Sequence, residues 1–457
     1  MSDLAAGPEG AAPVRPARHG LLLLVVGLGG FVTTLDNTVV TVALPTIQAE
    51  LGASLAALEW IVTGYVLTFS GFMLAGGRLA DVYGRRRVLI AGLAVFTAAS
   101  LAAGLATSAG ALVAARLVQG SGAALILPAM LAVVSVGNDD RRRSAGVAVW
   151  MASGAGALAL GPVVGGYLTQ HSHWSWVFLL NVPLGALVIA LAAVAIPESR
   201  DGAAARVDVP GVVTSVVVLS TGTFALTFGA ELGWTTPVIP AAAAVSVVAA
   251  VVFVAVERLG RDPMVDLALF RSRAFTGGVA AQVLWGLGVN GVFFFTALFL
   301  QGVLGFSPTM SGLAFVPLAL LVVVVTPLVP AVERRIGAGR TVALGLLLVA
   351  AGMAAVGFLR PGDGWADLLP AVCVIGIGSA LTMPLGSAVL GAVPESRAGV
   401  AGGVFSVARE MSGLFGIAVI GVIVNSSASF TAGYSAGLLT AAGLVVVGAV
   451  VSLVTLR

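Results

Sequence analysis

Charged residues are the first thing this sequence has little of. They make up 9% of its 457 residues, against roughly 25% in a soluble globular protein, while 59% of the residues are apolar. Lysine is absent, so the 23 basic side chains are all arginines and the formal net charge is only +3. So small a share of charge excludes a water-soluble fold, a disordered chain and a nucleic-acid-binding protein.

Residues of metal, redox and hydrolytic sites are scarce as well. A single cysteine, Cys373, excludes an internal disulfide and a thiolate metal site. His171 and His173 have no third ligand near them in the sequence, whereas a zinc site needs three or four ligands. No HExxH, GxSxG or P-loop pattern occurs. We therefore expect no enzyme, no metal site and no cofactor.

Long apolar runs are what the sequence does contain. A membrane-spanning helix needs roughly 20 mostly apolar residues. The sequence predicts 14 such spans, at 20–43, 55–76, 88–108, 110–133, 144–168, 174–196, 211–230, 237–257, 275–302, 309–331, 340–359, 367–391, 399–425 and 433–456. The 60 glycines suit closely packed membrane helices. We predict an all-α polytopic membrane protein.

The arginines predict how the chain is oriented in the membrane. With the N-terminus inside, all but three of them fall in cytoplasmic segments. The exceptions are Arg360, outside, and Arg116 and Arg409, within the spans. An even number of spans then places both termini in the cytoplasm.

A weak internal repeat relates the two ends of the chain. At an offset of 253 residues, GRRRVLIAG (84–92) lies over GAGRTVALG (337–345), and AGVA occurs at both 145–148 and 398–401. Parallel half-repeats are typical of transporters whose substrate site lies between the halves near the membrane midplane. The offset predicts an N-terminal six-helix bundle (20–196), an inserted helix pair (211–257) and a C-terminal six-helix bundle (273–457). Residues 1–19 are rich in Pro, Gly and Ala, which predicts a disordered cytoplasmic tail.

Three ionisable residues deep in the predicted spans are functional candidates, because a charge at the bilayer centre costs roughly 2.5–3.5 kcal/mol. Asp36 faces a cavity or, alternatively, lies at the membrane edge. Arg116 lies at a similar depth and either pairs with Asp36 or extends to the outer surface. Glu410 either pairs with Arg409 or faces the cavity, where it binds cationic drugs or carries a second proton. We favour the cavity, because adjacent residues of a helix point about 100° apart.

Weaker candidates for a substrate cavity are polar and aromatic. Gln119, Asn290 and Asn425 contact substrate or simply make interhelical hydrogen bonds. Trp285 and Phe294 line an aromatic cavity or pack in the core or against lipid.

Five segments resemble motifs of the major facilitator superfamily, and specifically of its 14-helix drug:proton antiporters. They are LDNTVVTVALP (35–45), GRLADVYGRRRVL (77–89), RLVQGSGAA (116–124), GPVVGG (161–166) and WSWVFLLNVP (174–183). The resemblance covers nearly the whole chain. Ser175 departs from it where the family usually has Arg, and so does Glu410, where a Gln often follows the Arg.

The resemblance implies roles for these motifs. Arg116 would take part in proton coupling, a role for which Asp36 and Glu410 are candidates from their own positions. Gly77, Asp81, Gly84, Arg85 and Arg86 would form a conformational latch between the halves. Gly161, Pro162, Gly165 and Gly166 would form the antiporter motif, on a kinked and closely packed helix. Independently, the 77–87 loop either only fixes topology by its charge or places Asp81 at the N-terminus of a neighbouring helix.

The resemblance also implies a fold and an activity. We expect a major facilitator fold, with two six-helix bundles and an inserted pair, in the bacterial cytoplasmic membrane. We expect it to export hydrophobic or amphipathic drugs or antibiotics by proton-coupled antiport and alternating access. Its partners would be substrate, protons and membrane lipid, without nucleic acid, and it would act as a monomer. The alternatives are a proton-linked transporter of a metabolite or lipid, import included, and a membrane enzyme or receptor.

Overall fold

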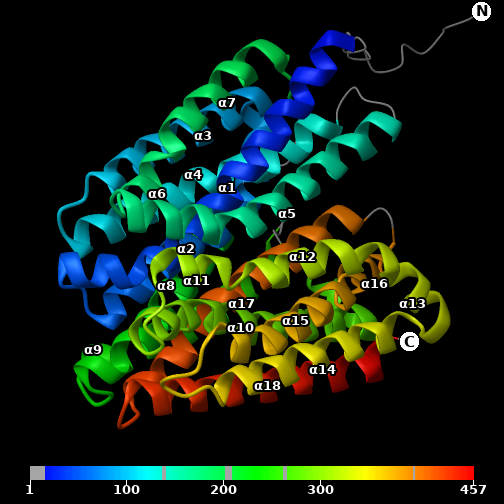
Figure 1. The fold of residues 1–457 in the computed structure, drawn as a ribbon. Helices are drawn as coiled ribbons and strands as arrows, with labels where there is room; N and C mark the ends of the chain where they lie inside the picture. Colours follow the sequence, from blue (N-terminus) through cyan, green and yellow to red (C-terminus); the bar gives the residue numbers. More distant parts are fainter. Residues whose placement is uncertain (1–15, 136–139, 201–207, 261–264, 395–396, 457) are drawn as a thin grey trace, which may run out of the picture.

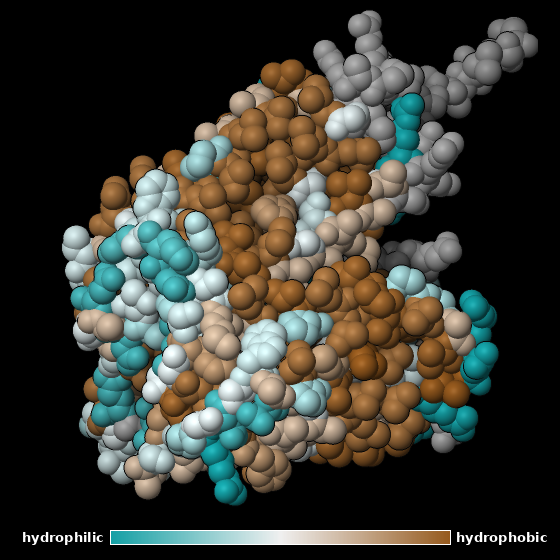
Figure 2. Space-filling view, viewed as in Figure 1, coloured by the Kyte–Doolittle hydropathy of each residue, from teal (hydrophilic) through white to brown (hydrophobic). Residues whose placement is uncertain are grey.

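The computed structural model describes residues 16–135, 140–200, 208–260, 265–394 and 397–456, and within them all regular structure is helical. Fourteen segments are long and apolar enough to cross a membrane, as the sequence predicts. The space-filling view shows apolar surface along the flanks of the molecule and hydrophilic residues toward its ends (Figure 2). That distribution suits helices surrounded by lipid.

The helices fall into three groups along the chain. The first group comprises α1 (Pro16–Leu51), α2 (Leu55–Tyr83), α3 (Arg85–Gly104), α4 (Ala109–Ser135), α5 (Asp140–His171), α6 (Trp176–Leu179) and α7 (Asn181–Ala195). The second is the pair α8 (Val209–Leu232) and α9 (Val238–Leu259). The third comprises η1 (Leu267–Arg271), α10 (Arg273–Gly302), α11 (Pro308–Leu313), α12 (Val316–Val325), η2 (Thr326–Leu328), α13 (Val329–Ile336), α14 (Ala338–Gly357), α15 (Trp365–Leu381), α16 (Pro384–Gly391), α17 (Ala398–Asn425) and α18 (Phe430–Thr455).

Serine or aspartate residues cap the N-termini of several of these helices. Each accepts a hydrogen bond from a backbone N–H of the first turn, which satisfies a donor that the helix itself leaves free. These capping residues are Ser54, Asp208, Ser272, Ser307 and Ser429.

The predicted spans differ from the helices at the N-terminus and where a span is divided, because the sixth consists of α6 and α7, the twelfth of α15 and α16, and the tenth of four segments. Residues 1–15 of the predicted tail lie outside the described residues, and α1 already begins at Pro16. The tenth span is divided into α11, α12, η2 and α13 rather than being one helix. The division follows from Pro317, Pro327 and Pro330, because each removes a backbone donor and starts a new helical segment.

The internal repeat is visible in the element bounds. Helix α14 begins and ends 253 residues after α3. Both follow a glycine with a positive φ angle, 110° at Gly84 and 85° at Gly337. In Figure 1 the helices of the first and third groups form two neighbouring bundles, which we call the N-half and the C-half.

The two halves meet toward one side of the molecule. We call the end where Arg85, Arg86 and Arg87 begin α3 the arginine-rich side, and the other end the opposite side. Toward the opposite side, Gln301 Nε2 of α10 donates to the Val42 carbonyl of α1 at 2.8 Å. The halves diverge toward the arginine-rich side, where α1 also begins (Figure 1).

Candidate functional site

Asp36 and Arg116 form an ion pair inside the N-half. Arg116 Nη1 of α4 donates to Asp36 Oδ2 of α1 at 2.6 Å, and neither side chain has any exposed surface. The predicted pairing is confirmed. A buried ion pair needs further hydrogen bonds to offset the loss of water around both charges.

Gln119 supplies part of this support. It lies one turn after Arg116 and so faces the same way. Its Oε1 accepts from Arg116 Nη1 at 2.7 Å, and its Nε2 donates to Asp36 Oδ1 and to Ser100 Oγ of α3, both at 2.8 Å. We expected Gln119 either to contact substrate or to make interhelical hydrogen bonds, and these bonds occupy its oxygen and both of its N–H groups.

Asn181 completes the shell around Asp36, and sequence reasoning missed it. Its Nδ2 donates to Asp36 Oδ1 at 2.7 Å and to Ser100 Oγ at 3.0 Å. Asn181 is the first residue of α7, directly after the break at Leu180. An amide within the apolar run WVFLLNVP was the available signal.

The guanidinium of Arg116 also contacts two residues of α2, a backbone carbonyl and an aromatic ring. Its Nε donates to the Ile61 carbonyl at 2.9 Å, and its central carbon lies 4.3 Å from the centre of the Tyr65 ring. Such a cation–π contact adds roughly 2 kcal/mol when both groups are shielded from water. Gly120 allows this approach, because a Cβ there would overlap the Tyr65 carbonyl.

Glu410 does not lie unpaired. Arg409 Nη2 donates to Glu410 Oε1 at 2.9 Å, and Arg409 Nε donates to the same oxygen at 3.2 Å. The expectation that Arg409 is a poor partner is wrong, because its long side chain bends around the helix to its neighbour. The Arg409 side chain remains 50% exposed and that of Glu410 18%, so the pair is accessible.

The other substrate candidates do not share one cavity. Phe294 is buried and packs edge-on against Phe295, while Asn425 is exposed at the last residue of α17. Asn290 donates to the Gly286 carbonyl at 3.1 Å, and its amide lies against Gly413 of α17. Trp285, one turn earlier, has no hydrogen-bond partner for its buried Nε1 among the described residues.

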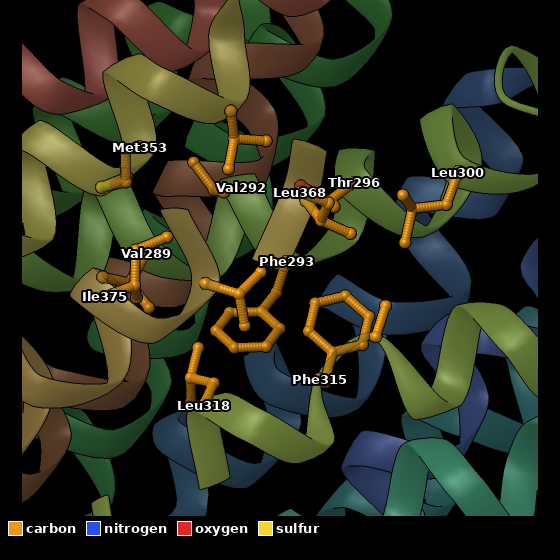
Figure 3. A pocket seen from close by; sticks show the side chains of 13 residues that line it. Val289, Val292, Phe293, Thr296, Leu300, Phe315, Leu318, Met353, Leu368 and Ile375 are labelled. Carbon is orange, nitrogen blue, oxygen red and sulfur yellow. The ribbon is translucent and has the colours of Figure 1, made fainter. Parts of the chain in front are cut away.

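An apolar pocket lies within the C-half, between α10, α12 with the residues just before it, α14 and α15 (Figure 3). The Phe293 and Phe315 rings stack across it with their centres 5.0 Å apart. Thr296 is its polar lining residue, and its hydroxyl already bonds to that of Tyr434 at 2.9 Å. Phe293 lines the pocket and Phe294 does not, because neighbouring helix residues point about 100° apart.

The loop between α2 and α3 is held within the N-half. Asp81 Oδ1 accepts from Arg85 Nη2 at 2.9 Å. Asp81 therefore does not take the predicted place at a helix N-terminus. Glu198 takes that place at α3, where its Oε1 accepts from the Arg86 N–H at 3.3 Å and its Oε2 lies 3.6 Å from Arg87 Nε.

The glycines around this loop allow close packing. A Cβ on Gly84 would overlap the Glu198 carboxylate, and its positive φ also favours glycine. Gly77 lies in ordinary contact with Pro128 of α4. The tighter approach to α4 is at Gly76, where a Cβ would overlap the Ala124 carbonyl.

The segment GPVVGG of α5 contacts α1, which carries Asp36, and also the surface where the two halves meet, which we call the seam. Gly161 and Gly165 pack against Thr38 and Val39 of α1, directly after Asp36 in the chain. Gly166 packs against Pro308 of the C-half, and the Pro162 carbonyl against Gly312. Helix α5 therefore contacts both α1 and the C-half.

Comparisons with known proteins agree with this architecture. Residues 26–417 match the family described as Major Facilitator Superfamily. Multidrug resistance protein Stp of Mycobacterium tuberculosis is 34% identical over 413 residues, which cover 90% of this chain and 77% of Stp. The cephamycin export protein CmcT of Amycolatopsis lactamdurans is 36% identical over 406 residues, covering 87% of this chain and 84% of CmcT. A solved POT family transporter in complex with 5-aminolevulinic acid has a TM-score of 0.73 at 14% identity, covering 98% of both chains.

Proposed function

Because the chain belongs to the Major Facilitator Superfamily, we propose that it exports hydrophobic or amphipathic drugs or antibiotics by proton-coupled antiport. The names of its relatives, a multidrug resistance protein and a cephamycin export protein, support the substrate class. The observation that carries the coupling is the fully buried Asp36–Arg116 pair. It is a transporter rather than an enzyme, and we propose that it acts as a monomer.

Protonation of Asp36 is the coupling step. Asp36 as a carboxylate neutralises Arg116, and a proton on Asp36 removes that neutralisation. An uncompensated charge at a buried site is strongly destabilising, at roughly 3–5 kcal/mol. Either the site opens to water or the helices rearrange, and the α1–α5 contacts carry the change to the seam between the halves.

The arginine-rich side faces the cytoplasm in this proposal, with both termini inside, because arginine is retained on the cytoplasmic side of a bacterial membrane. Contact between the halves toward the opposite side then corresponds to an inward-facing conformation. Drug enters this conformation from the cytoplasm and leaves outside after the halves exchange contacts. The 77–87 loop acts as the latch of the outward-facing state.

Substrate binds between α10 and α17. Trp285 has a buried N–H without a partner among the described residues and Asn290 has an amide, and both reach substrate only when α10 and α17 separate. A cationic drug competes with Arg409 for Glu410, since both are positively charged and the pair is accessible. A neutral drug needs no such exchange.

Drug accumulation in everted membrane vesicles tests the proposal. With the proton gradient imposed, ethidium uptake by Asp36→Asn should fall to the level that wild type shows with a protonophore. Glu410→Gln should lose ethidium but retain puromycin carried in its neutral form. Glu231→Gln, an exposed acid outside the site, is the matched control and should accumulate both.

Full gradient-driven uptake by Asp36→Asn would overturn the coupling role. If proton flux is intact but no drug in a broad panel is moved, a metabolite or lipid is the substrate instead.

A further inference from the structure

Glu59 is a buried acid that the ion-pair network does not use. It lies in the second turn of α2, near the opposite side, and has no exposed surface. Among the described residues, neither of its carboxylate oxygens has a hydrogen-bond partner. A carboxylate taken out of water without partners is very costly, whereas the neutral acid costs far less.

Three parts of the molecule close over this carboxyl. Gly421 of α17 lies against it so closely that a Cβ there would overlap its oxygens. The Thr227 hydroxyl of α8 also faces it. Beside it, Trp60 stacks on Phe228 of α8 with the ring centres 6.3 Å apart. Glu59 therefore lies where the N-half, the inserted pair and the C-half meet.

The charged groups around Glu59 do not neutralise it. On α8, Glu231 acts on it and is itself an acid. Arg86, at the start of α3, lies on the arginine-rich side, at the other end of α2 from Glu59. The other described charged side chains of the helices packed against α2 have partners of their own. These are Asp36 with Arg116, Arg85 with Asp81, Arg87 with Glu198, Arg409 with Glu410, and Glu50 with His173.

We propose that Glu59 is a proton-binding site of the seam, and that the halves close on the opposite side only when Glu59 is protonated. It lies four residues into α2, about 6 Å from the helix end, so separation of α17 exposes it to solvent on that side. The proton enters and leaves by that side, so Glu59 gates closure rather than carrying a second proton across. The proposal rests on the alternating access proposed above and gives α8 the role of covering the site.

The test follows the seam directly and needs no drug. Thr107→Cys and Pro361→Cys place spin labels on exposed loops of the N-half and C-half at the opposite side, in a Cys373→Ser background. Distances are measured across a pH series in nanodiscs. Asp36→Asn is present throughout, so the result is independent of the Asp36 coupling.

We expect the short-distance population to fall as pH rises. For one proton, the open-to-closed ratio increases by up to about tenfold per pH unit. Adding Glu59→Gln, which resembles the protonated acid, should keep the seam closed at every pH. Glu59→Asp should retain the pH dependence, and so should Glu231→Gln, which removes the neighbouring acid but leaves the Glu59 carboxyl in place. Infrared spectra should show a protonated carboxyl band that Glu59→Gln lacks.

Equal pH dependence with and without Glu59→Gln would overturn the proposal, as would the absence of that infrared band. Because Asp36 is already neutral in every sample, these outcomes leave the proton-coupled export proposal unaffected.

Discussion

At Asp36, side chains from two helices place three hydrogen-bond donors on one carboxylate, and a fourth polar group, Ser100, braces two of them. These hydrogen bonds are buried, and a hydrogen bond is stronger in a protein interior than in water. The arrangement distinguishes a charged Asp36 sharply from a protonated one. That distinction is what a proton-driven switch requires.

The guanidinium geometry is tested by Arg116→Lys. A lysine ammonium cannot reach Ile61, Asp36 and Gln119 together, because it lacks the planar fork. We expect proton-driven drug uptake to fall at least tenfold and the unfolding temperature to drop. Arg360→Lys, in an exposed loop, is the control for the same substitution and should change neither quantity. Wild-type uptake by Arg116→Lys would reduce the role of Arg116 to that of a point charge.

How far these residues could be predicted differs from one to the next. The Asp36–Arg116 pair followed from two similar depths in apolar helices. Asn181 and Ser100 did not, because their contacts depend on how α3 and α7 pack. Glu59 was overlooked because it lies near the start of a predicted span, where an acid needs no partner if it faces water. Its burial arises only from α8 and α17, which are distant in the sequence.

At the scale of helices, α5 is the element that connects the ion pair to the seam. Its glycines let it lie against α1 on one face and α11 on another. A run of small residues in an apolar helix predicts close packing, but it does not identify the partner. The breaks in the tenth span could also have been predicted, because a proline lies at the start of each segment. The segment was instead predicted as one helix because its residues are almost continuously apolar.

The seam glycines are tested by Gly166→Ala. The added Cβ would overlap the Pro308 carbonyl of the C-half, so contact between the halves on the opposite side should weaken. We expect the short distance between labels at Thr107 and Pro361 to lose population, with each half still folded. Gly156→Ala on the same helix meets nothing within 4 Å and is the matched control. An unchanged distance distribution in Gly166→Ala would show that this contact does not hold the seam.

For the whole molecule, the proposed mechanism has the two halves close one side at a time, with the α2–α3 loop as the latch of one state. Asp81 is paired with Arg85 of its own half. This pairing suits a conformation in which the halves diverge on the arginine-rich side (Figure 1). The equivalent position of the second half is Arg334, so the acid exists in one half only.

Asp81→Asn should slow turnover more than it weakens drug binding, because a latch stabilises one conformation without touching substrate. We expect the transport rate to fall severalfold while the dissociation constant for ethidium stays within twofold. Asp363→Asn, in a loop on the opposite side, serves as the control. If Asp81→Asn instead bound ethidium more weakly but transported each bound molecule at the wild-type rate, the latch role of Asp81 would be contradicted.

The inserted pair makes the seam unequal on its two flanks. On one flank α8 lies across both halves, and its Leu219 shares an apolar cluster with Val66 of α2 and Leu414 of α17. On the other flank α5 packs directly on α11 and α12. One flank of the seam is thus covered by a helix that belongs to neither bundle, whereas on the other flank the two bundles contact each other directly. The internal repeat relates the two bundles, yet the insertion leaves the molecule with two unlike flanks.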